Sequence, residues 1–353
     1  MKYLLSIITP CHNAKSSMLE RAFDSLREQT VGFENIEWVV VNHNDDECAV
    51  NQIRTMTESF PNVSAYVLND GYTAPATPRN YGLERATGEY VGFLDQDDWF
   101  EPDAFEKVLR HIKEADMASF QFHPVCADDG VQTVPPFSLL DGRGDVIEME
   151  PDTWDSSLFM HIMALGIWTK VYRREFIEKH NLRFDGGVHF CDDALFNIEC
   201  FHRAKRICFL PNHVGYNYFL HENSTVQNTN KTPEQIVNYA AGFATTFARG
   251  LSYGLYMNGV IWGYLCYQSA LMIVSSDLSL RKRMRIRRML SPYLKTEQME
   301  SDYAQKSFVN DCKDMYRFSK AVIGHPILIH LFVFLMRIMK VDLASKLKGR
   351  QQY

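Results

Sequence analysis

The segment from Thr77 to Phe100 decides the fold, and it reads TPRNYGLERATGEYVGFLDQDDWF. Residues 79–86 favour a helix, which the pair Thr87-Gly88 ends. Residues 90–94 (YVGFL) form a short apolar run with β-branched and aromatic side chains, which is typical of a strand covered on both faces. A helix followed by such a strand predicts an α/β domain built on a buried sheet.

Three aspartates follow the predicted strand directly, namely Asp95, Asp97 and Asp98. Ligands of open α/β sheets bind at the carboxyl ends of the strands. Carboxylates this close repel one another unless a cation lies between them. A divalent metal that holds a diphosphate fits this position, because hard cations prefer oxygen ligands. The structural alternative is a surface turn, or a helix N-cap at Asp98 for a helix that begins near Pro102.

The segment resembles the core of family 2 glycosyltransferases, the large inverting group with a GT-A fold. The resemblance covers about the first 225 residues. It implies a Rossmann-like nucleotide-binding sheet with flanking helices in residues 1–225, with a nucleotide-binding half (1–100) and an acceptor half (101–225). Residues 226–353 remain as a mostly helical region. The residues that match the family's run are Arg79, Asn80, Gly82, Leu83, Ala86, Gly88, Glu89, Tyr90, Phe93, Leu94, Asp95, Asp97 and Asp98.

The resemblance also implies a donor site at the ends of the first strands. Thr9, Pro10 and Asn13 match the family's opening motif and would line the nucleotide pocket, with Pro10 ending the strand because proline cannot donate to a ladder. Asn42 stands where most members have an aspartate that contacts the base. An amide both donates and accepts, so a UDP-sugar stays the first expectation. The full expected donor set is Thr9, Pro10, Asn13, Asn42, Arg79, Asn80, Asp95, Gln96 and Asp97.

Structural alternatives exist for parts of this donor set. The residues around Pro10 also suit a simple turn from a strand into a helix. Arg79 would reach toward the base or the diphosphate, or it is a solvated helix residue.

A second acidic pair, Asp192-Asp193, lies where family members carry G-E-D-x-x-F with the aspartate as catalytic base. Asp193 aligns with that base, Asp192 replaces the glutamate, and Cys191 replaces the glycine. The chemistry needs one carboxylate that takes the proton of the acceptor hydroxyl as its oxygen attacks the anomeric carbon. Asp192 would raise the proton affinity of the pair. The alternative is an N-cap of a helix over residues 194–201, which would not exclude catalysis.

Two further residues match family blocks and keep open alternatives. Trp168 lies in a segment similar to W-x-K-L-Y-x-R and would stack on an acceptor sugar, or pack in the core. His221 falls where some members bring a histidine to the metal or the diphosphate, although a lone histidine is otherwise structural. With Asp95 and Asp97, His221 completes the ligands expected for Mn²⁺ or Mg²⁺. Phe219 stands where an arginine is common.

The composition indicates an ordinary globular protein, with 353 residues of which 46% are hydrophobic and 23% charged. The apolar run at the start is too short for a signal peptide, and no window reaches the roughly 18 apolar residues that a membrane span needs. We therefore expect a cytoplasmic protein. Eight scattered cysteines without a CxxC pair predict neither disulfides nor zinc.

The net charge of −6 hides an asymmetry along the chain. Residues 281–353 contain 16 Lys and Arg against 6 Asp and Glu, whereas residues 1–280 contain 21 against 37. The basic end suggests an anionic contact. Residues 327–339 (ILIHLFVFLMRIM) are too short to span a bilayer but suit a helix that lies in a membrane surface. A core helix of the C-terminal region is the alternative.

The resemblance, taken together with these features, implies an inverting hexosyl- or N-acetylhexosaminyl-transferase of the bacterial capsule or cell-surface polysaccharide type. Its partners would be a nucleotide-sugar donor and a glycan or lipid-linked glycan acceptor at the inner face of the cell membrane, and no nucleic acid. A nucleotidyltransferase remains open, although it would usually need a Gly-rich, basic phosphate loop, which residues 10–14 (PCHNA) do not provide. A non-catalytic protein that binds nucleotide sugars also remains open.

Overall fold

The computed structural model describes residues 3–44, 50–51, 53–55, 58–71, 75–126, 130–131, 145–150, 166–221, 231–253, 270, 273–274, 277–295, 318 and 320–338. The chain divides into two compact units. The first unit comprises Met1–Asp155, His161–Gly187 and Asp192–His221, and the second comprises Ser156–Met160, Val188–Cys191 and Glu222–Tyr353. The domain boundary expected from the sequence lies after residue 225.

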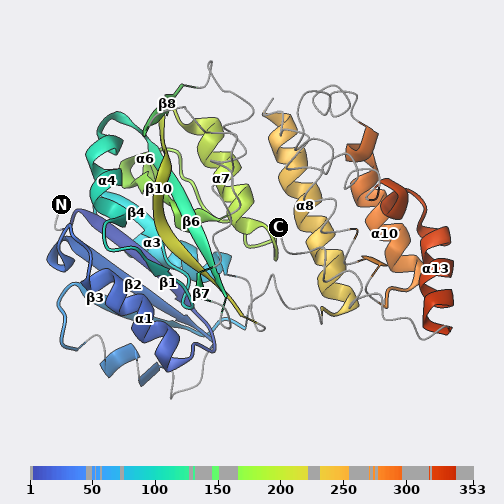
Figure 1. The fold of residues 1–353 in the computed structure, drawn as a ribbon, viewed down its shortest axis with the longest axis horizontal. Helices are drawn as coiled ribbons and strands as arrows, with labels where there is room; N and C mark the ends of the chain where they lie inside the picture. The colour runs from blue at the N-terminus through green and yellow to red at the C-terminus, as the bar shows by residue number, and fades with distance from the viewer. Residues whose placement is uncertain are drawn as a thin grey trace. The chain divides into compact units, whose positions relative to one another are not determined.

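The first unit is built on one mixed sheet (Figure 1). Its described strands are β1 (Leu5–Cys11), β2 (Ile36–His43), β3 (Val63–Leu68), β4 (Tyr90–Phe93), β5 (Trp99–Phe100), β6 (Met117–Cys126), β7 (Gly130–Val131), β8 (Ile147–Met149), β9 (Lys170–Arg173) and β10 (Ile207–Leu220). The strand order is β3-β2-β1-β4-β9-β6-β10-β5, with β7 paired to β6 and β8 paired to β10. Strands β3, β2, β1 and β4 are parallel, whereas β9 is antiparallel to both β4 and β6.

Helices cover both faces of this sheet. They are α1 (Ser16–Arg27), α3 (Ala76–Arg85), α4 (Ala104–His111), α6 (Arg174–Lys179) and α7 (Asp192–Arg203). On one face, α1 and α4 share an apolar cluster with Ile7 of β1, in which Phe23 stacks on Trp38 with ring centroids 5.0 Å apart. Successive strand residues point to opposite faces. Ile8 therefore lies on the other face, where it packs against Gly82 of α3.

The strands and helices predicted around the aspartate segment are confirmed, with small shifts at their ends. The strand predicted over residues 90–94 is β4, which ends one residue early. The prediction that Pro10 ends the first strand is wrong, because β1 continues to Cys11 and Pro10 pairs with Val41 of β2. β4 pairs with β1 only as far as Ile8, so β1 has a neighbour on one side at Pro10 and the missing N–H interrupts no ladder.

The turn between α3 and β4 is fixed by a buried carboxylate. Glu37 of β2 accepts hydrogen bonds from Ser6 Oγ at 2.5 Å and from the Thr87 backbone N at 2.7 Å. Gly88 N donates to Ser6 Oγ at 2.8 Å. A Cβ on Gly88 would lie 2.6 Å from the Ser6 backbone nitrogen, so the chain approaches β1 closely only with glycine here. This turn sets β4, and with it the aspartates, beside β1.

The described helices of the second unit include α8 (Pro233–Ser252), α10 (Leu280–Leu290) and α13 (Pro326–Ile338) (Figure 1). α8 begins with a capping box, in which Thr232 Oγ1 accepts from Gln235 N at 3.2 Å and Gln235 Oε1 accepts from Thr232 N at 2.7 Å. α10 packs against both α8 and α13. The predicted helix at 327–339 is confirmed as α13, although Met339 lies outside the described residues.

Candidate active site

The carboxyl ends of β1, β2 and β4 lie at one edge of the sheet, since these strands are parallel neighbours. His12 N donates to Gln96 Oε1 at 2.7 Å, and Gln96 Nε2 donates to the His12 carbonyl at 2.9 Å. His12 Nδ1 lies 2.8 Å from the carbonyl oxygen of His43, at the end of β2. The chain after β1 is therefore bound both to the end of β2 and to the aspartate loop after β4.

The expected donor residues differ in how their side chains are placed. Thr9 is fully buried, and its Oγ1 accepts a hydrogen bond from Trp38 Nε1 at 2.9 Å. Asn80 exchanges two hydrogen bonds with the backbone of Phe184, at 2.9 and 2.8 Å. These contacts favour packing roles for Thr9 and Asn80, and their contact with a donor stays a prediction. Asn42 is buried at the end of β2, Pro10 is half-buried, and Asn13 is exposed with a φ of 51°.

The aspartate loop combines two partly exposed carboxylates with a buried one. The side chains of Asp95 and Asp97 are 27% and 24% exposed, whereas Asp98 is buried. Asp98 accepts hydrogen bonds from Tyr216 Oη and from Phe219 N, both at 2.7 Å. Burial, together with the charges of Asp97 and Asp95, raises the pKa of Asp98 well above its usual value. The alternative that Asp98 caps the next helix is wrong, because Asp98 is bonded to β10 and α4 begins only at Ala104.

Arg79 joins the aspartate loop to the second acidic pair. Its Nη2 donates to Asp95 Oδ1 at 3.3 Å, and its Nη1 donates to Asp192 Oδ2 at 2.8 Å. The residue is buried, so the alternative of a solvated helix residue is wrong. Burial alone would lower the pKa of Arg79, but the charges of Asp192, Asp95 and Asp193 outweigh it and raise the pKa. The guanidinium is therefore a permanent cation between two groups of carboxylates.

The second acidic pair lies in the first turn of α7, which begins at Asp192. Asp192 is buried against Arg79, while Asp193 is half-buried and its Oδ1 accepts from Ala194 N at 2.8 Å. Burial raises the pKa of Asp193 to about 7, with the charge of Asp192 adding to the rise and Arg79 opposing it. A carboxylate with this pKa can accept a proton efficiently near neutral pH.

The last two expected site residues lie in different surroundings. His221 Nε2 is 2.8 Å from Asp97 Oδ2, beside the expected metal ligand. Trp168 is buried, with its ring stacked on Tyr216 at 4.6 Å and on Tyr218 at 5.4 Å between centroids. This location favours the core alternative, and a contact of Trp168 with an acceptor sugar stays a prediction.

Residues 6–180 match the family model described as Glycosyl transferase family 2. The chain belongs to glycosyltransferase family 2. It is 28% identical over 243 residues to YibD of Escherichia coli strain K12, an uncharacterized glycosyltransferase. That alignment covers 67% of this chain and 66% of YibD.

The family 2 glycosyltransferase is also similar to TarS of Staphylococcus aureus strain Mu50, a poly(ribitol-phosphate) beta-N-acetylglucosaminyltransferase. The identity is 25% over 241 residues, covering 65% of this chain and 38% of TarS. The crystal structure of S. aureus TarS 1–349 with UDP-GlcNAc has a TM-score of 0.55 at 18% identity, covering 99% of this chain and 93% of that one. Mannosyltransferase PcManGT from Pyrobaculum calidifontis, in complex with GDP-Man and Mn²⁺, has a TM-score of 0.51 at 13% identity, covering 93% and 88%. These structures support the GT-A fold.

Two residues of the candidate site make contacts that were not expected from the sequence. Arg21 of α1 donates from Nη2 to the Asp97 carbonyl at 2.6 Å, with its guanidinium 3.9 Å from the Trp99 ring centre and 4.4 Å from that of Phe219. Tyr216 Oη accepts from Asp95 N at 3.2 Å in addition to its bond to Asp98. No local motif in the sequence marks Arg21, and the position of Tyr216 in the sequence does not reveal its contacts.

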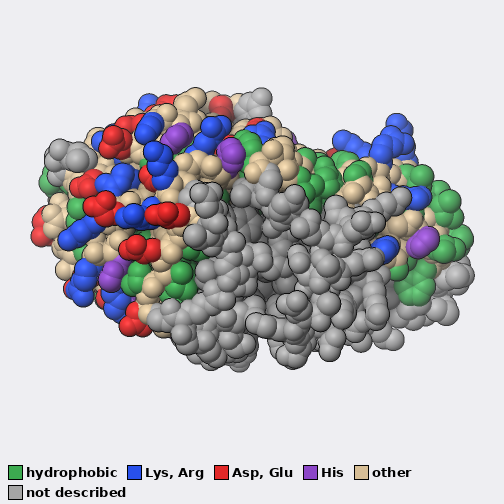
Figure 2. All heavy atoms as spheres, turned by 90° about the horizontal axis from the view of Figure 1, so that it is seen from above, with side chains coloured by type: hydrophobic (Ala, Val, Ile, Leu, Met, Phe, Trp, Pro, Cys, Tyr) green, Lys and Arg blue, Asp and Glu red, His purple; other side chains and the backbone are tan. Residues whose placement is uncertain are grey.

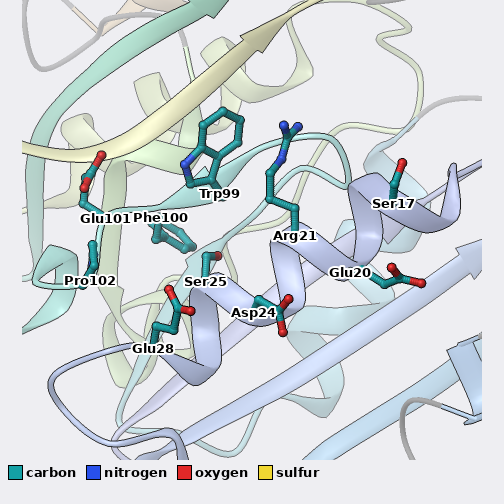
Figure 3. Close-up of a pocket in the computed structure, with 10 residues that line it drawn as sticks. All are labelled: Ser17, Glu20, Arg21, Asp24, Ser25, Glu28, Trp99, Phe100, Glu101 and Pro102. Atoms are coloured by element: carbon teal, nitrogen blue, oxygen red, sulfur yellow. The ribbon is translucent and has the colours of Figure 1, made fainter. Parts of the chain in front are cut away.

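The hollow beside Arg21 is not suited to the donor of a glycosyltransferase. It has a volume of about 400 Å³ and lies between α1 and residues 99–102 (Figure 3). The side chains of Arg21 and Trp99 lie next to each other at the hollow (Figure 3). The carboxylates that line it are Glu20, Asp24, Glu28 and Glu101. Four carboxylates against one guanidinium disfavour an anionic nucleotide.

The aspartate loop fits a hard divalent cation by the chemistry of its donor set. Asp95 and Asp97 offer partly exposed carboxylates, and His221 lies against Asp97. Within the described ranges, no three His, Cys, Asp or Glu side chains form a complete metal-binding group. Mg²⁺ is usually bound through one or two carboxylates together with substrate phosphates and water. Two carboxylates in one loop would therefore be enough for a divalent cation whose other ligands are phosphates and water.

Proposed function

We propose that this glycosyltransferase moves a sugar from a nucleotide diphosphate sugar to a hydroxyl of a cell-surface glycan or lipid-linked glycan, with inversion at the anomeric carbon. The observation that carries the proposal is the buried Arg79, which contacts Asp95 of the aspartate loop and Asp192 beside Asp193. One side chain thus links the loop proposed to bind the donor to the acidic pair proposed to contain the base. A UDP-sugar is the first donor to test, because the structure of TarS was solved with UDP-GlcNAc.

In the proposed reaction Asp193 removes the proton of the acceptor hydroxyl while that oxygen forms a bond to the anomeric carbon. The bond from the anomeric carbon to the diphosphate breaks in the same displacement, so the configuration inverts. The negative charge of Asp192 helps to keep the pKa of Asp193 raised, so that Asp193 can accept a proton. Arg79 holds Asp192 in place through a hydrogen bond. Arg21 and Tyr216 fix the backbone of the aspartate loop.

Asp97 and Asp95, with His221 beside Asp97, would hold Mn²⁺ or Mg²⁺ at this site. A bound divalent cation would stabilise the negative charge of the departing diphosphate. The structure of PcManGT, solved with GDP-Man and Mn²⁺, supports the choice of cation.

A donor screen tests the proposal directly. The full chain with Mn²⁺ is given UDP-, GDP-, dTDP- and CMP-sugars, and binding and slow donor hydrolysis are measured for wild type, Asp97→Ala and Asp193→Asn. Asp185→Asn is the matched control, since Asp185 is exposed and its amide replacement can still accept from Gly187 N. We expect Asp97→Ala to lose metal-dependent donor binding. Asp193→Asn should bind the donor but, once an acceptor is added, transfer the sugar roughly 10²- to 10⁴-fold more slowly than wild type.

The outcomes separate the remaining functional classes. The match to family 2 favours a glycosyltransferase over a nucleotidyltransferase. Tight donor binding without hydrolysis or transfer in the presence of glycan and lipid-linked acceptors would favour a non-catalytic binding protein. Failure to bind any nucleotide sugar in the presence of Mn²⁺ would overturn the proposal. We also propose that the enzyme acts at the inner face of the cell membrane, where a lipid-linked acceptor would be available.

A further inference from the structure

Helix α13 of the second unit exposes large apolar side chains along one face. Five of them are between 44% and 62% exposed, namely Ile327, Leu328, Leu331, Phe332 and Phe334. At 100° per residue they occupy one continuous arc of the helix. Val333, which points away from this arc, is buried. Soluble surfaces carry scattered apolar residues, but a contiguous apolar face marks an interaction site.

Helix α10, which packs against α13, exposes a basic face. Arg281, Arg285, Arg287 and Arg288 are exposed, and Leu280 and Met284 lie among them, each 37% exposed. The opposite side of α10 is buried through Ile286 and Leu290. Figure 2 shows basic side chains gathered next to apolar ones at this end of the second unit (right).

Within the described helices, none is long and apolar enough to cross a bilayer. An apolar helix face beside arginines has the composition of a helix that lies in the interface of an anionic membrane, with the apolar side chains among the acyl chains and the cations at the head groups. A protein partner would have to match four arginines with carboxylates around an apolar centre. A lipid surface provides the negative charge and the apolar layer together.

We propose that the exposed faces of α13 and α10 form one membrane-docking surface that binds anionic phospholipid bilayers. Leu328 and Phe332 enter the bilayer, and Arg285 and Arg288 bind the phosphate-bearing head groups. The proposal goes beyond the transfer reaction and uses no residue of the candidate active site.

The test is co-sedimentation of the full chain with vesicles of phosphatidylcholine alone and with phosphatidylglycerol added to about a third of the lipid. We expect wild type to bind the anionic vesicles and Leu328→Glu with Phe332→Glu to lower the partition coefficient at least about tenfold. Arg285→Glu with Arg288→Glu should remove the preference for anionic lipid. Because all four side chains are exposed, these variants should keep the circular dichroism and thermal unfolding of wild type.

Matched controls separate the surface from general effects of charge. Val67→Glu changes an apolar residue on β3 that is as exposed as Phe332, at 44%. Lys113→Glu with Lys179→Glu reverses two exposed cations of the first unit. Both controls, and Asp97→Ala, should bind vesicles as wild type does, so a failure of the donor site leaves this test intact.

Two results would overturn the proposal. One is equal vesicle binding, or none, by wild type and both surface variants. The other is a dimer in analytical ultracentrifugation that Leu328→Glu with Phe332→Glu dissociates while vesicle binding is unchanged, since the apolar face would then belong to a second copy of the chain.

Discussion

Asp193 should give the transfer reaction a simple dependence on pH. Burial raises the pKa of this carboxyl to about 7, and the proposed base works only when it has lost its proton. Below pH 7 the deprotonated fraction falls tenfold per pH unit, so the rate should rise from pH 5 to about 7 and then level off. Initial rates at saturating donor and metal, from pH 5 to 8.5, test this expectation.

Asp193→Asn provides the comparison for that profile. Loss of a general base typically costs 10²- to 10⁴-fold in rate. The variant should be slower by roughly this factor, and its residual rate should no longer rise through pH 7. A wild-type rate that is flat between pH 5 and 7 would contradict the assignment of Asp193.

Arg79 should matter for stability as well as for the site. Arg79→Met would leave Asp192 buried without its cation, and breaking a buried ion pair in this way costs roughly 3–5 kcal/mol. Urea denaturation should show a decrease of this size in the free energy of unfolding. Arg85→Met, on the same helix but with its side chain 30% exposed, should lower the free energy of unfolding by less than about 1 kcal/mol. Equal effects of the two substitutions would contradict the role given to Arg79.

Single residues of the site were predicted from acidic runs together with the resemblance to family 2. The resemblance decided between a site and a structural turn or N-cap for Asp95, Asp97 and Asp193, and their roles stay predictions. The partners of these carboxylates were not predicted. Arg79 and Asp192 are 113 positions apart in the sequence, and no local pattern indicates that they form a hydrogen bond. Cys191 shows the same limit. Its φ of 65° is a left-handed backbone conformation, which favours the glycine that family members have at this position. A cysteine in the sequence does not indicate that conformation.

At the scale of elements, the turn between α3 and β4 should tolerate no side chain at Gly88. A Cβ there would lie 2.6 Å from the Ser6 backbone nitrogen, and backbone cannot move aside as a flexible side chain can. Gly88→Ala should therefore lower the free energy of unfolding by roughly 1–3 kcal/mol, measured by urea denaturation. Gly186→Ala is the control, since nothing lies within 4 Å of the added Cβ. A Gly88→Ala protein as stable as the control would show that the turn can open.

Elements with a regular pattern were predictable, and β10 was not. The strands β1 to β4 are short and rich in apolar and β-branched residues, so they can be recognised as strands directly from the sequence. β10 contains Pro211, Asn212 and Gly215, which resemble turn signals. The structure places them at shifts of register against β6, between Phe209 and Tyr216. An irregular strand of this kind keeps its pairing while losing the alternation that identifies a strand.

At the scale of the whole molecule, membrane binding should depend on salt. Raising the ionic strength from 0.1 to 1 M shortens the Debye length from about 10 to about 3 Å and weakens the attraction between the arginines of α10 and anionic lipid. The vesicle-bound fraction of wild type should fall, whereas the fraction of Arg285→Glu with Arg288→Glu should change little. Vesicle binding of wild type that does not respond to salt would show that the arginines of α10 contribute nothing.

The bonds from β10 to the aspartate loop also set an order of events during protein synthesis. Phe219 follows Asp98 by 121 positions, and His221 follows Asp97 by 124. At about 5–20 residues per second, the ribosome needs roughly 6–24 s to add the residues between Asp98 and Phe219. During that interval the parallel strands β1 to β4 are already available for pairing, but Asp98 lacks both of its hydrogen-bond donors. A chain cut short before residue 216 would thus keep the strands that carry the aspartates and never complete the loop, so early truncation should yield no partly active enzyme.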